Sequence, residues 1–320
     1  TYTNKYKYNI SKDSNYLKFT SSSVSDSFSK ALADTSEYRT FSLTSDYRFS
    51  RDLDANTNKG TLYIYGNNHS MHMDTMEYGI RAENQILNIQ DMGRFSLSSV
   101  SETASDAIKM YDKNGDLGYY RVSIGNQGFN SWRSYGHIIE AKELNIRNSV
   151  INNNSSGGSS VYTPNVDGLF KADIINIDNS IFKDNSSKAI PDSNRIKGSL
   201  LSGLNLYINN SVFISNSGSY SDFNSYANIY ARDSLSVQNS AFIGNFITIP
   251  NLYGNTHSVY GGAINSDELL VVRNSTFDSN YVYAHNDDDN LAAYVYGGAI
   301  ECSGVSFIFN SLFTDNYAQS

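Results

Sequence analysis

Acidic side chains near the end of this chain are the first residues with types and spacing that could do chemistry. Three consecutive carboxylates, Asp287, Asp288 and Asp289, lie inside the run 286–290. Oxygen-rich clusters of this kind suit Ca²⁺. The same composition is typical of a solvated charged loop. Calcium at these residues is therefore the one cofactor that the sequence suggests.

Histidines near the start of the chain offer a second set of metal-ligand types. His72 and Asp74 share one face of an expected strand, because alternate residues of a strand face the same side. His69 belongs instead to a Gly-Asn-x-His turn that begins at Gly66. A zinc site needs further ligands, and none is evident beside these residues. We predict no metal here.

Polysaccharide cleavage is the enzymatic hypothesis that the sequence raises. Arg195-Ile196-Lys197 is similar to a tripeptide of polygalacturonases, and Gly136-His137 is similar to part of their Gly-His-Gly element, with Ile138 in place of the second glycine. Glycoside hydrolysis requires two carboxylates, but no Asp-Asp pair precedes this histidine. We predict no catalytic residues and keep a polysaccharide lyase or hydrolase of pectate-lyase-like fold as the second hypothesis.

Tyrosine is the residue that most favours a binding function. The chain has 25 tyrosines, several of them in the segments 246–260 and 281–296. Tyr supplies amphipathic contact area at low entropy cost, which suits protein or glycan recognition. Alternatively, alternate tyrosines pack along a short extra strand. The candidate binding residues of these two loops are Tyr253, Tyr260, Tyr281, Tyr283, Asp287, Asp288, Asp289, Tyr294 and Tyr296.

A phrase repeated six times indicates the elements that hold these residues. It contains two apolar residues separated by a polar one, then Asn-Ser, then an apolar position and Phe, then Asn. Successive Asn-Ser pairs are 31, 31, 29, 35 and 36 residues apart, which is typical of stacked repeats. The pairs begin at Asn148, Asn179, Asn210, Asn239, Asn274 and Asn310.

The apolar residues of each repeat alternate with polar ones, a pattern that predicts strands. Each repeat is expected to form one rung of a coil: strand, turn, strand, Asn-Ser turn, a short strand carrying Phe, and an Asn turn. Coiling stacks equivalent strands in parallel about 4.8 Å apart. We predict an all-β chain that forms a right-handed parallel β-helix, a solenoid of about nine rungs with an N-terminal capping segment.

Equivalent side chains of successive rungs should superpose. The phenylalanines are expected to form one interior stack, and the Asn of each Asn-Ser pair should align along one corner with left-handed backbone, which Asn tolerates. The structural repeat residues are Phe182, Asn185, Phe213, Asn216, Phe242, Asn245, Phe277, Asn280, Phe313 and Asn316.

The pattern divides the chain into three parts. Residues 1–60 are expected to form an N-terminal cap and the first strands, with a short helix at 27–33. Residues 61–135 are expected to form irregular rungs, marked by the segments 62–64, 87–89 and 122–124. Residues 136–320 carry the regular repeats and are expected to be truncated at the C-terminus. Linkers between these repeats hold 13, 12, 10, 15 and 16 residues, so insertions are expected on one edge.

The last two repeats suggest a family. Gly261-Gly262-Ala263-Ile264 with Phe277–Asn280, and Gly297-Gly298-Ala299-Ile300 with Phe313–Asn316, resemble the GGA(I/L/V) and FxxN repeats of chlamydial polymorphic membrane proteins. The resemblance covers roughly residues 136–320. It implies an autotransporter passenger with a β-helix, displayed at the bacterial cell surface or outer membrane, or secreted, that acts in adhesion and virulence.

Charge and cysteine content agree with that expectation. A net charge of −8 argues against nucleic acid and against an anionic membrane as partner. No apolar run reaches the length of a membrane helix, so we expect no membrane insertion of this fragment. The single cysteine, Cys302, can form no intrachain disulfide. The expected partner is a host-cell surface protein or glycan, or a second copy of the chain.

Overall fold

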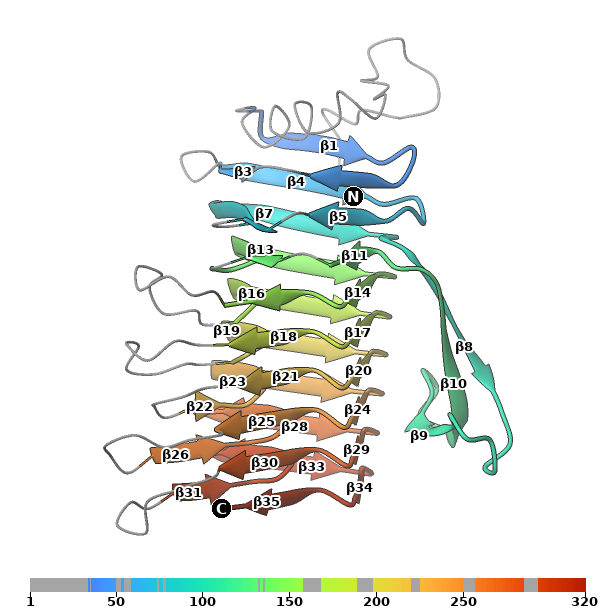
Figure 1. Cartoon of the computed structure of the whole chain (residues 1–320), viewed down its shortest axis with the longest axis vertical. Coiled ribbons are helices and arrows are strands. Elements are labelled where there is room, and N and C mark those ends of the chain that lie inside the picture. The colour runs from blue at the N-terminus through green and yellow to red at the C-terminus, as the bar shows by residue number, and fades with distance from the viewer. Residues whose placement is uncertain are drawn as a thin grey trace.

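The computed structural model describes residues 34, 36–49, 53–54, 59–73, 75–76, 79–131, 133–134, 136–157, 168–188, 198–219, 225–249, 257–284 and 293–320. Every regular element in this part of the chain is a strand. Three long parallel sheets run along one axis, and the chain visits them in turn, so the molecule is a parallel β-helix (Figure 1). The predicted helix at 27–33 lies outside the described residues.

Sheet A has 12 strands and contributes the longest side of each rung. Its strands are β1 (Tyr38–Ser42), β3 (Leu53–Asp54), β4 (Gly60–Tyr65), β7 (Ile80–Gln90), β13 (Ile139–Arg147), β16 (Phe170–Asp178), β19 (Leu201–Asn209), β23 (Ile229–Gln238), β27 (Ile264–Ser266), β28 (Leu269–Arg273), β32 (Ile300–Cys302) and β33 (Val305–Phe309).

Sheet B has nine strands, and sheet C has eight. The strands of sheet B are β2 (Tyr47–Phe49), β5 (Met71–Met73), β11 (Phe129–Asn130), β14 (Val150–Asn152), β17 (Ile181–Lys183), β20 (Val212–Ile214), β24 (Ala241–Ile243), β29 (Thr276–Asp278) and β34 (Leu312–Thr314). Those of sheet C are β6 (Thr75–Met76), β12 (Arg133–Ser134), β15 (Ser155–Ser156), β18 (Ser186–Lys188), β21 (Ser217–Ser219), β25 (Phe246–Ile249), β30 (Tyr281–Ala284) and β35 (Tyr317–Gln319).

The interior is held together by stacks of like side chains. Alternate residues of sheet A, such as Leu206 and Ile208, point inward and are buried. The predicted phenylalanine stack is present: the rings of Phe182, Phe213 and Phe242 lie 4.8 and 4.9 Å apart and nearly parallel. The stack continues through Phe277 to Phe313 at 4.7 and 5.0 Å. Each ring thus covers the next, and one apolar column runs through five rungs.

A buried row of asparagines closes each of these rungs beside the phenylalanines. Asn216 is typical, since its Nδ2 donates to the carbonyl of Phe182 and to Oδ1 of Asn245, at 3.0 and 2.9 Å. Its own Oδ1 accepts from the backbone N and the Nδ2 of Asn185. The buried amide therefore uses its full hydrogen-bonding capacity and links three rungs.

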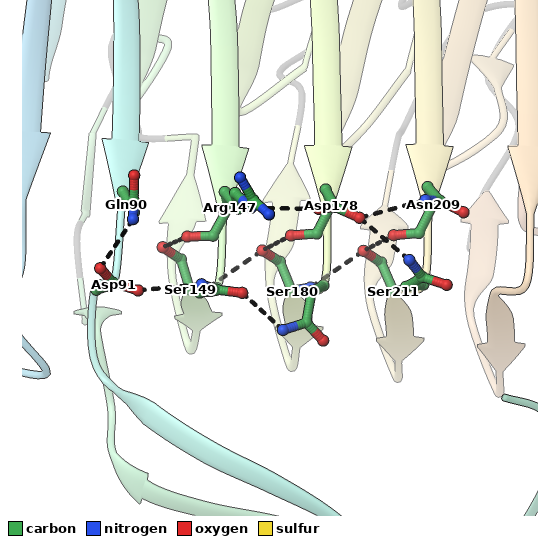
Figure 2. Close-up of polar contacts among 11 residues, drawn as sticks. Gln90, Asp91, Arg147, Ser149, Asp178, Ser180, Asn209 and Ser211 are labelled. Atoms are coloured by element: carbon green, nitrogen blue, oxygen red, sulfur yellow. Dashed lines mark hydrogen bonds and ion pairs between the residues drawn. The ribbon is translucent and has the colours of Figure 1, made fainter. Parts of the chain in front are cut away.

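The Asn-Ser corner between sheets A and B forms a second, outer ladder. All six predicted Asn residues have left-handed backbone, with φ between 44° and 48°. Beside them, the N–H of Ser149 donates to Oγ of Ser180, and the N–H of Ser180 donates to Oγ of Ser211, each at 3.1 Å (Figure 2). Each of these hydroxyls donates to the carbonyl two residues earlier. Corner donors and acceptors are therefore satisfied from rung to rung.

The rungs differ from the predicted outline in two respects. The two strands expected before Asn-Ser are one continuous strand in β13, β16, β19 and β23, because the short polar segment between them lacks a turn sequence and stays extended. A third strand follows the closing Asn, in sheet C, where the sequence indicated only a linker. Its early members are Ser- and Gly-rich, so they carry no apolar alternation to predict a strand.

The number of rungs is as predicted, but the segment 122–124 does not mark a rung. Nine strands of sheet B mark nine rungs within the described residues. The apolar residues Val122 and Ile124 belong to none of them. They lie in an antiparallel arm made of β8 (Arg94–Ser99), β9 (Ile108–Tyr111) and β10 (Leu117–Asn126), which lies beside the stack (Figure 1). The first strand β1 supplies the remaining rung.

The arm leaves the coil at the corner between sheets A and B. It begins after Gly93 and ends before Gly128, both with positive φ of 73° and 60°. A Cβ on Gly93 would lie 2.3 Å from the backbone N of Gly128. The start and the end of the arm therefore lie in backbone contact at Gly93 and Gly128, and the chain resumes the rung after Gly128. The prediction that insertions gather on one edge was made for the linkers of the regular repeats, and the arm lies outside them, at a different corner of the coil.

Candidate functional site

The predicted binding tyrosines lie on a two-layer edge beside the last rungs. Here sheet C faces a short parallel sheet, sheet E, formed by β22 (Ser225–Tyr226), β26 (His257–Tyr260) and β31 (Ala293–Tyr296). Ile247 and Val282 of sheet C pack with Val259 of sheet E in a small core of their own. Since side chains alternate along a strand, the neighbouring aromatic residues point away from this core.

On sheet C the outward aromatic residues form one row. The rings of Phe246 and Tyr281 lie 4.8 Å apart, and those of Tyr281 and Tyr317 lie 4.9 Å apart, all nearly parallel. Burial raises the pKa of the Tyr281 phenol, and Tyr317 adds to this shift. The hydroxyl of Tyr281 therefore remains protonated at neutral pH and can donate a hydrogen bond.

Sheet E also carries exposed tyrosines. Tyr260 and Tyr296 stack with ring centroids 5.1 Å apart. Tyr294 and Tyr296 keep 49% and 44% of their surface accessible. Tyr260 and Tyr296 cover one face of each other's rings, so this surface offers the remaining ring surface and the hydroxyl groups to a partner. We call Tyr260, Tyr281, Tyr283, Tyr294 and Tyr296 the tyrosine edge.

The structure places these residues on strands, whereas the sequence assigned them to loops. Tyr281 and Tyr283 lie on β30, Tyr260 on β26, and Tyr294 and Tyr296 on β31. Their alternation with Val259, Val282 and Val295 is the signal for a strand. The alternative of a short extra strand therefore describes their position. Tyr253, Asp287, Asp288 and Asp289 lie outside the described residues.

A polar groove crosses the outer face of sheet A, away from the tyrosine edge. Its volume is about 370 Å³, and its lining includes Glu83, Glu140, Lys171, Asp173 and Arg232. Two of its three carboxylates are already paired with cations: Glu140 lies 3.1 Å from Lys171, and Glu83 lies 3.2 Å from Arg81. Glycoside hydrolysis needs one carboxylic acid that faces a second carboxylate across the sugar. Carboxylates that are paired with cations do not form this arrangement.

The other residues considered for catalysis or metal binding are scattered. His137 is buried, and its Nδ1 lies 2.7 Å from the carbonyl oxygen of Gly168, so it holds two rungs together. His69 lies 3.4 Å from Asp46. Asp74 and residues 195–197 lie outside the described part of the chain. Among the described residues, no three His, Cys, Asp or Glu side chains gather as metal ligands.

The sequence did not predict that the outward face of sheet B is covered. The residues beside the inward phenylalanines, including Ile181, Val212 and Ala241, point outward from sheet B and yet are buried. Met110 of the arm packs on them. The signal was the apolar position between Asn-Ser and Phe in each repeat, because an outward residue of a bare solenoid should be polar. The arm is therefore an integral part of the fold.

Comparisons with protein-family models, with curated proteins and with solved structures give no match. In the described residues, no helix has the length and hydropathy needed to cross a membrane.

Proposed function

We propose that this chain is the binding part of a bacterial cell-surface or secreted adhesin, in which the β-helix is a stiff stalk and the tyrosine edge contacts a host-cell protein or glycan. The observation that carries the proposal is the outward tyrosine row of sheet E. Exposed aromatic residues on a rigid sheet bind with little loss of conformational entropy. Exposed apolar patches on a protein surface often mark interaction sites.

Two further observations support adhesion over catalysis. The groove carboxylates Glu83 and Glu140 are tied to cations. The GGAI and FxxN repeats resemble those of autotransporter adhesins, whose passengers are displayed outside the cell. Ladders of asparagine and serine make the stalk stiff, which suits a protein that must hold a binding surface away from a cell.

The test compares two tyrosine variants in the purified chain. Tyr294→Ser/Tyr296→Ser should weaken attachment to cultured epithelial cells by at least about tenfold, because interface tyrosines are frequent hot spots. The matched control is Tyr207→Ser on sheet A, since Tyr207 is similarly exposed at 48%. Both variants should keep the melting temperature of the parent chain. Unchanged attachment by the folded double variant would refute the proposed surface.

Two deletions test whether binding depends on the strands or on the segments 250–256 and 285–292 that connect them in the sequence. Shortening the segments 250–256 and 285–292 should leave the rungs folded, because loop closure depends weakly on loop length. Loss of attachment only in these deletions would transfer the binding role to the loops. Sedimentation of the parent chain tests the remaining partner, a second copy.

A further inference from the structure

The groove on sheet A repeats one three-residue pattern on successive rungs. In each strand a small residue lies between two other residues, of which the first is polar or large. Examples are Lys171-Ala172-Asp173 and Tyr230-Ala231-Arg232. The strands pair in register here, with Ala141 opposite Ala172, Ala172 opposite Gly203, and Gly203 opposite Ala231. The groove therefore follows the solenoid axis between two rows of larger side chains.

Close backbone approach explains why the middle row is small. A Cβ on Gly203 would lie 2.4 Å from the carbonyl oxygen of Ala172 and 2.9 Å from Cδ1 of Leu206. The alanines of this row belong to the core, so the floor of the groove is formed by backbone. Five strands, β7, β13, β16, β19 and β23, line it. At about 4.8 Å per strand, the groove is about 19 Å long.

The charges that line the groove favour a neutral ligand over a polyanion. Three carboxylates, those of Glu83, Glu140 and Asp173, line the groove with two cations, Lys171 and Arg232. Both cations already have carboxylate partners, since Lys171 pairs with Glu140, and Arg232 lies 2.8 Å from Asp233. A polyanion would meet an excess of negative charge. Hydroxyl groups can instead donate to the carboxylates and accept from the cations.

The geometry also favours a glycan over a peptide. An extended peptide gains its main-chain hydrogen bonds at the edge of a sheet. This groove crosses the face of sheet A, where most backbone groups are already paired between strands and the pairing is interrupted only at one row, at Asp173 and Leu204. A ligand must therefore bind side chains, which repeat once per rung. An extended polyhydroxylated chain meets this requirement along the whole groove.

We propose that the groove of sheet A binds an extended neutral polysaccharide, independently of the tyrosine edge. Lys171, Asp173 and Arg232 would bind sugar hydroxyls. Tyr230 is buried at one end of the groove, where its hydroxyl donates to Asp267, so it supports the site from below. The site is a binding site and includes no bond-breaking step.

Isothermal titration of the whole chain with neutral hexaoses tests the proposal. The probes are cellohexaose, mannohexaose and xylohexaose, with hexagalacturonate as the acidic comparison. At least one neutral hexaose should bind, and Asp173→Ala/Arg232→Ala should weaken that binding at least tenfold. Lys183→Ala/Asp184→Ala is the matched control, because it also removes one exposed cation and one exposed carboxylate, outside the groove.

Each outcome is decisive. Tighter binding of hexagalacturonate, failure of all three neutral hexaoses to bind, or equal binding by the two double variants would overturn the proposal. All variants alter exposed side chains, and an unchanged melting temperature shows that they fold. Retained hexaose binding by Tyr294→Ser/Tyr296→Ser would support two separate sites, whereas its loss would contradict the independence of the groove.

Discussion

Asparagine has two different roles in this molecule, and position within the rung decides which. At the outer corner, residues such as Asn179 adopt left-handed backbone, which Asn tolerates better than most residues. Inside the coil, residues such as Asn185 are buried, and their amides join three rungs. The outer role depends on backbone conformation and the inner role on hydrogen bonding, so the same residue type is required for unrelated physical reasons.

The phenylalanine column gives a prediction at this scale. Phe242→Ala should lower the free energy of unfolding by about 3–5 kcal/mol, since it opens a cavity between two stacked rings. Chemical denaturation measures this loss. Phe313→Ala is the internal control, because Phe313 is 42% exposed and should cost much less. Equal losses for the two variants would contradict the interior position of Phe242.

Glu301 gives a second prediction, on pH dependence. Burial raises the pKa of its carboxyl above the ordinary value of 4.5. The folded chain therefore holds this proton more tightly than the unfolded chain does, and the contribution to stability is complete below pH 4.5. It is lost as the pH rises through the raised pKa.

A glutamine side chain cannot ionise, so the Glu301→Gln variant should not lose stability as the pH rises through the raised pKa of Glu301. Its melting temperature relative to the parent chain should rise between about pH 4 and pH 7. A relative melting temperature that stays constant over this range, measured in parallel at each pH, would show that the burial of Glu301 has no influence on folding.

At the scale of elements, the antiparallel arm covers apolar residues that point outward from sheet B. It packs Met110 on Ile181 and Val212, and it hydrogen-bonds through the carbonyl of Lys113 to Nδ2 of Asn239. Its outer face carries a bidentate contact between Arg121 and Asp106, at 2.6 and 2.8 Å. The arm thus has an apolar inner face and a polar outer face, as a covering layer requires.

Removal of the arm is the corresponding prediction. Deleting residues 94–126 should leave the rungs formed but expose the outward apolar residues of sheet B, so the variant should aggregate and bind a hydrophobic dye. Light scattering and dye fluorescence measure both effects. Adding Ile181→Thr and Val212→Thr to the deletion should reduce aggregation. A deletion variant that stays monomeric and dye-free would refute the covering role.

These elements also show what the sequence could predict. The Phe and Asn positions recur with fixed spacing, so their ladders followed from the repeat alone. Ser186–Lys188 was not recognised as a strand, because its stability comes from pairing with neighbouring rungs and not from an apolar face of its own. Val122 and Ile124 were misassigned because a strand of the arm and a strand of a rung share the same alternation. The groove brings together side chains such as Lys171, Asp173 and Arg232 from different rungs, and their proximity appears only once the strands are in register.

The whole molecule is a stack in which each rung contacts chiefly its neighbours, so stability should vary along the axis. Central rungs are covered on both sides. In the last described rung, Phe307, Ile308 and Phe309 keep 45–49% of their surface accessible. A purified chain of these 320 residues should therefore open first at this rung.

Hydrogen exchange provides the measurement at this scale. Backbone amides of β19 and β20 should exchange far more slowly than those of β32, β33 and β34. The reason is that central strands have paired neighbours on both sides, whereas the last rung has them on one side. Uniform protection from one end to the other would indicate a single cooperative unit and contradict this expectation.

A stack of nearly identical rungs has an inherent ambiguity, since a chain that skips one repeat can still pair every strand with a similar one. The arm removes this ambiguity. It begins at the rung of β7 and makes its contacts at Ile181, Val212 and Asn239, which belong to later rungs. Those contacts form only when the intervening rungs are all present and in order. A skipped repeat would move Ile181, Val212 and Asn239 away from the arm, so these contacts favour the correct order of the rungs.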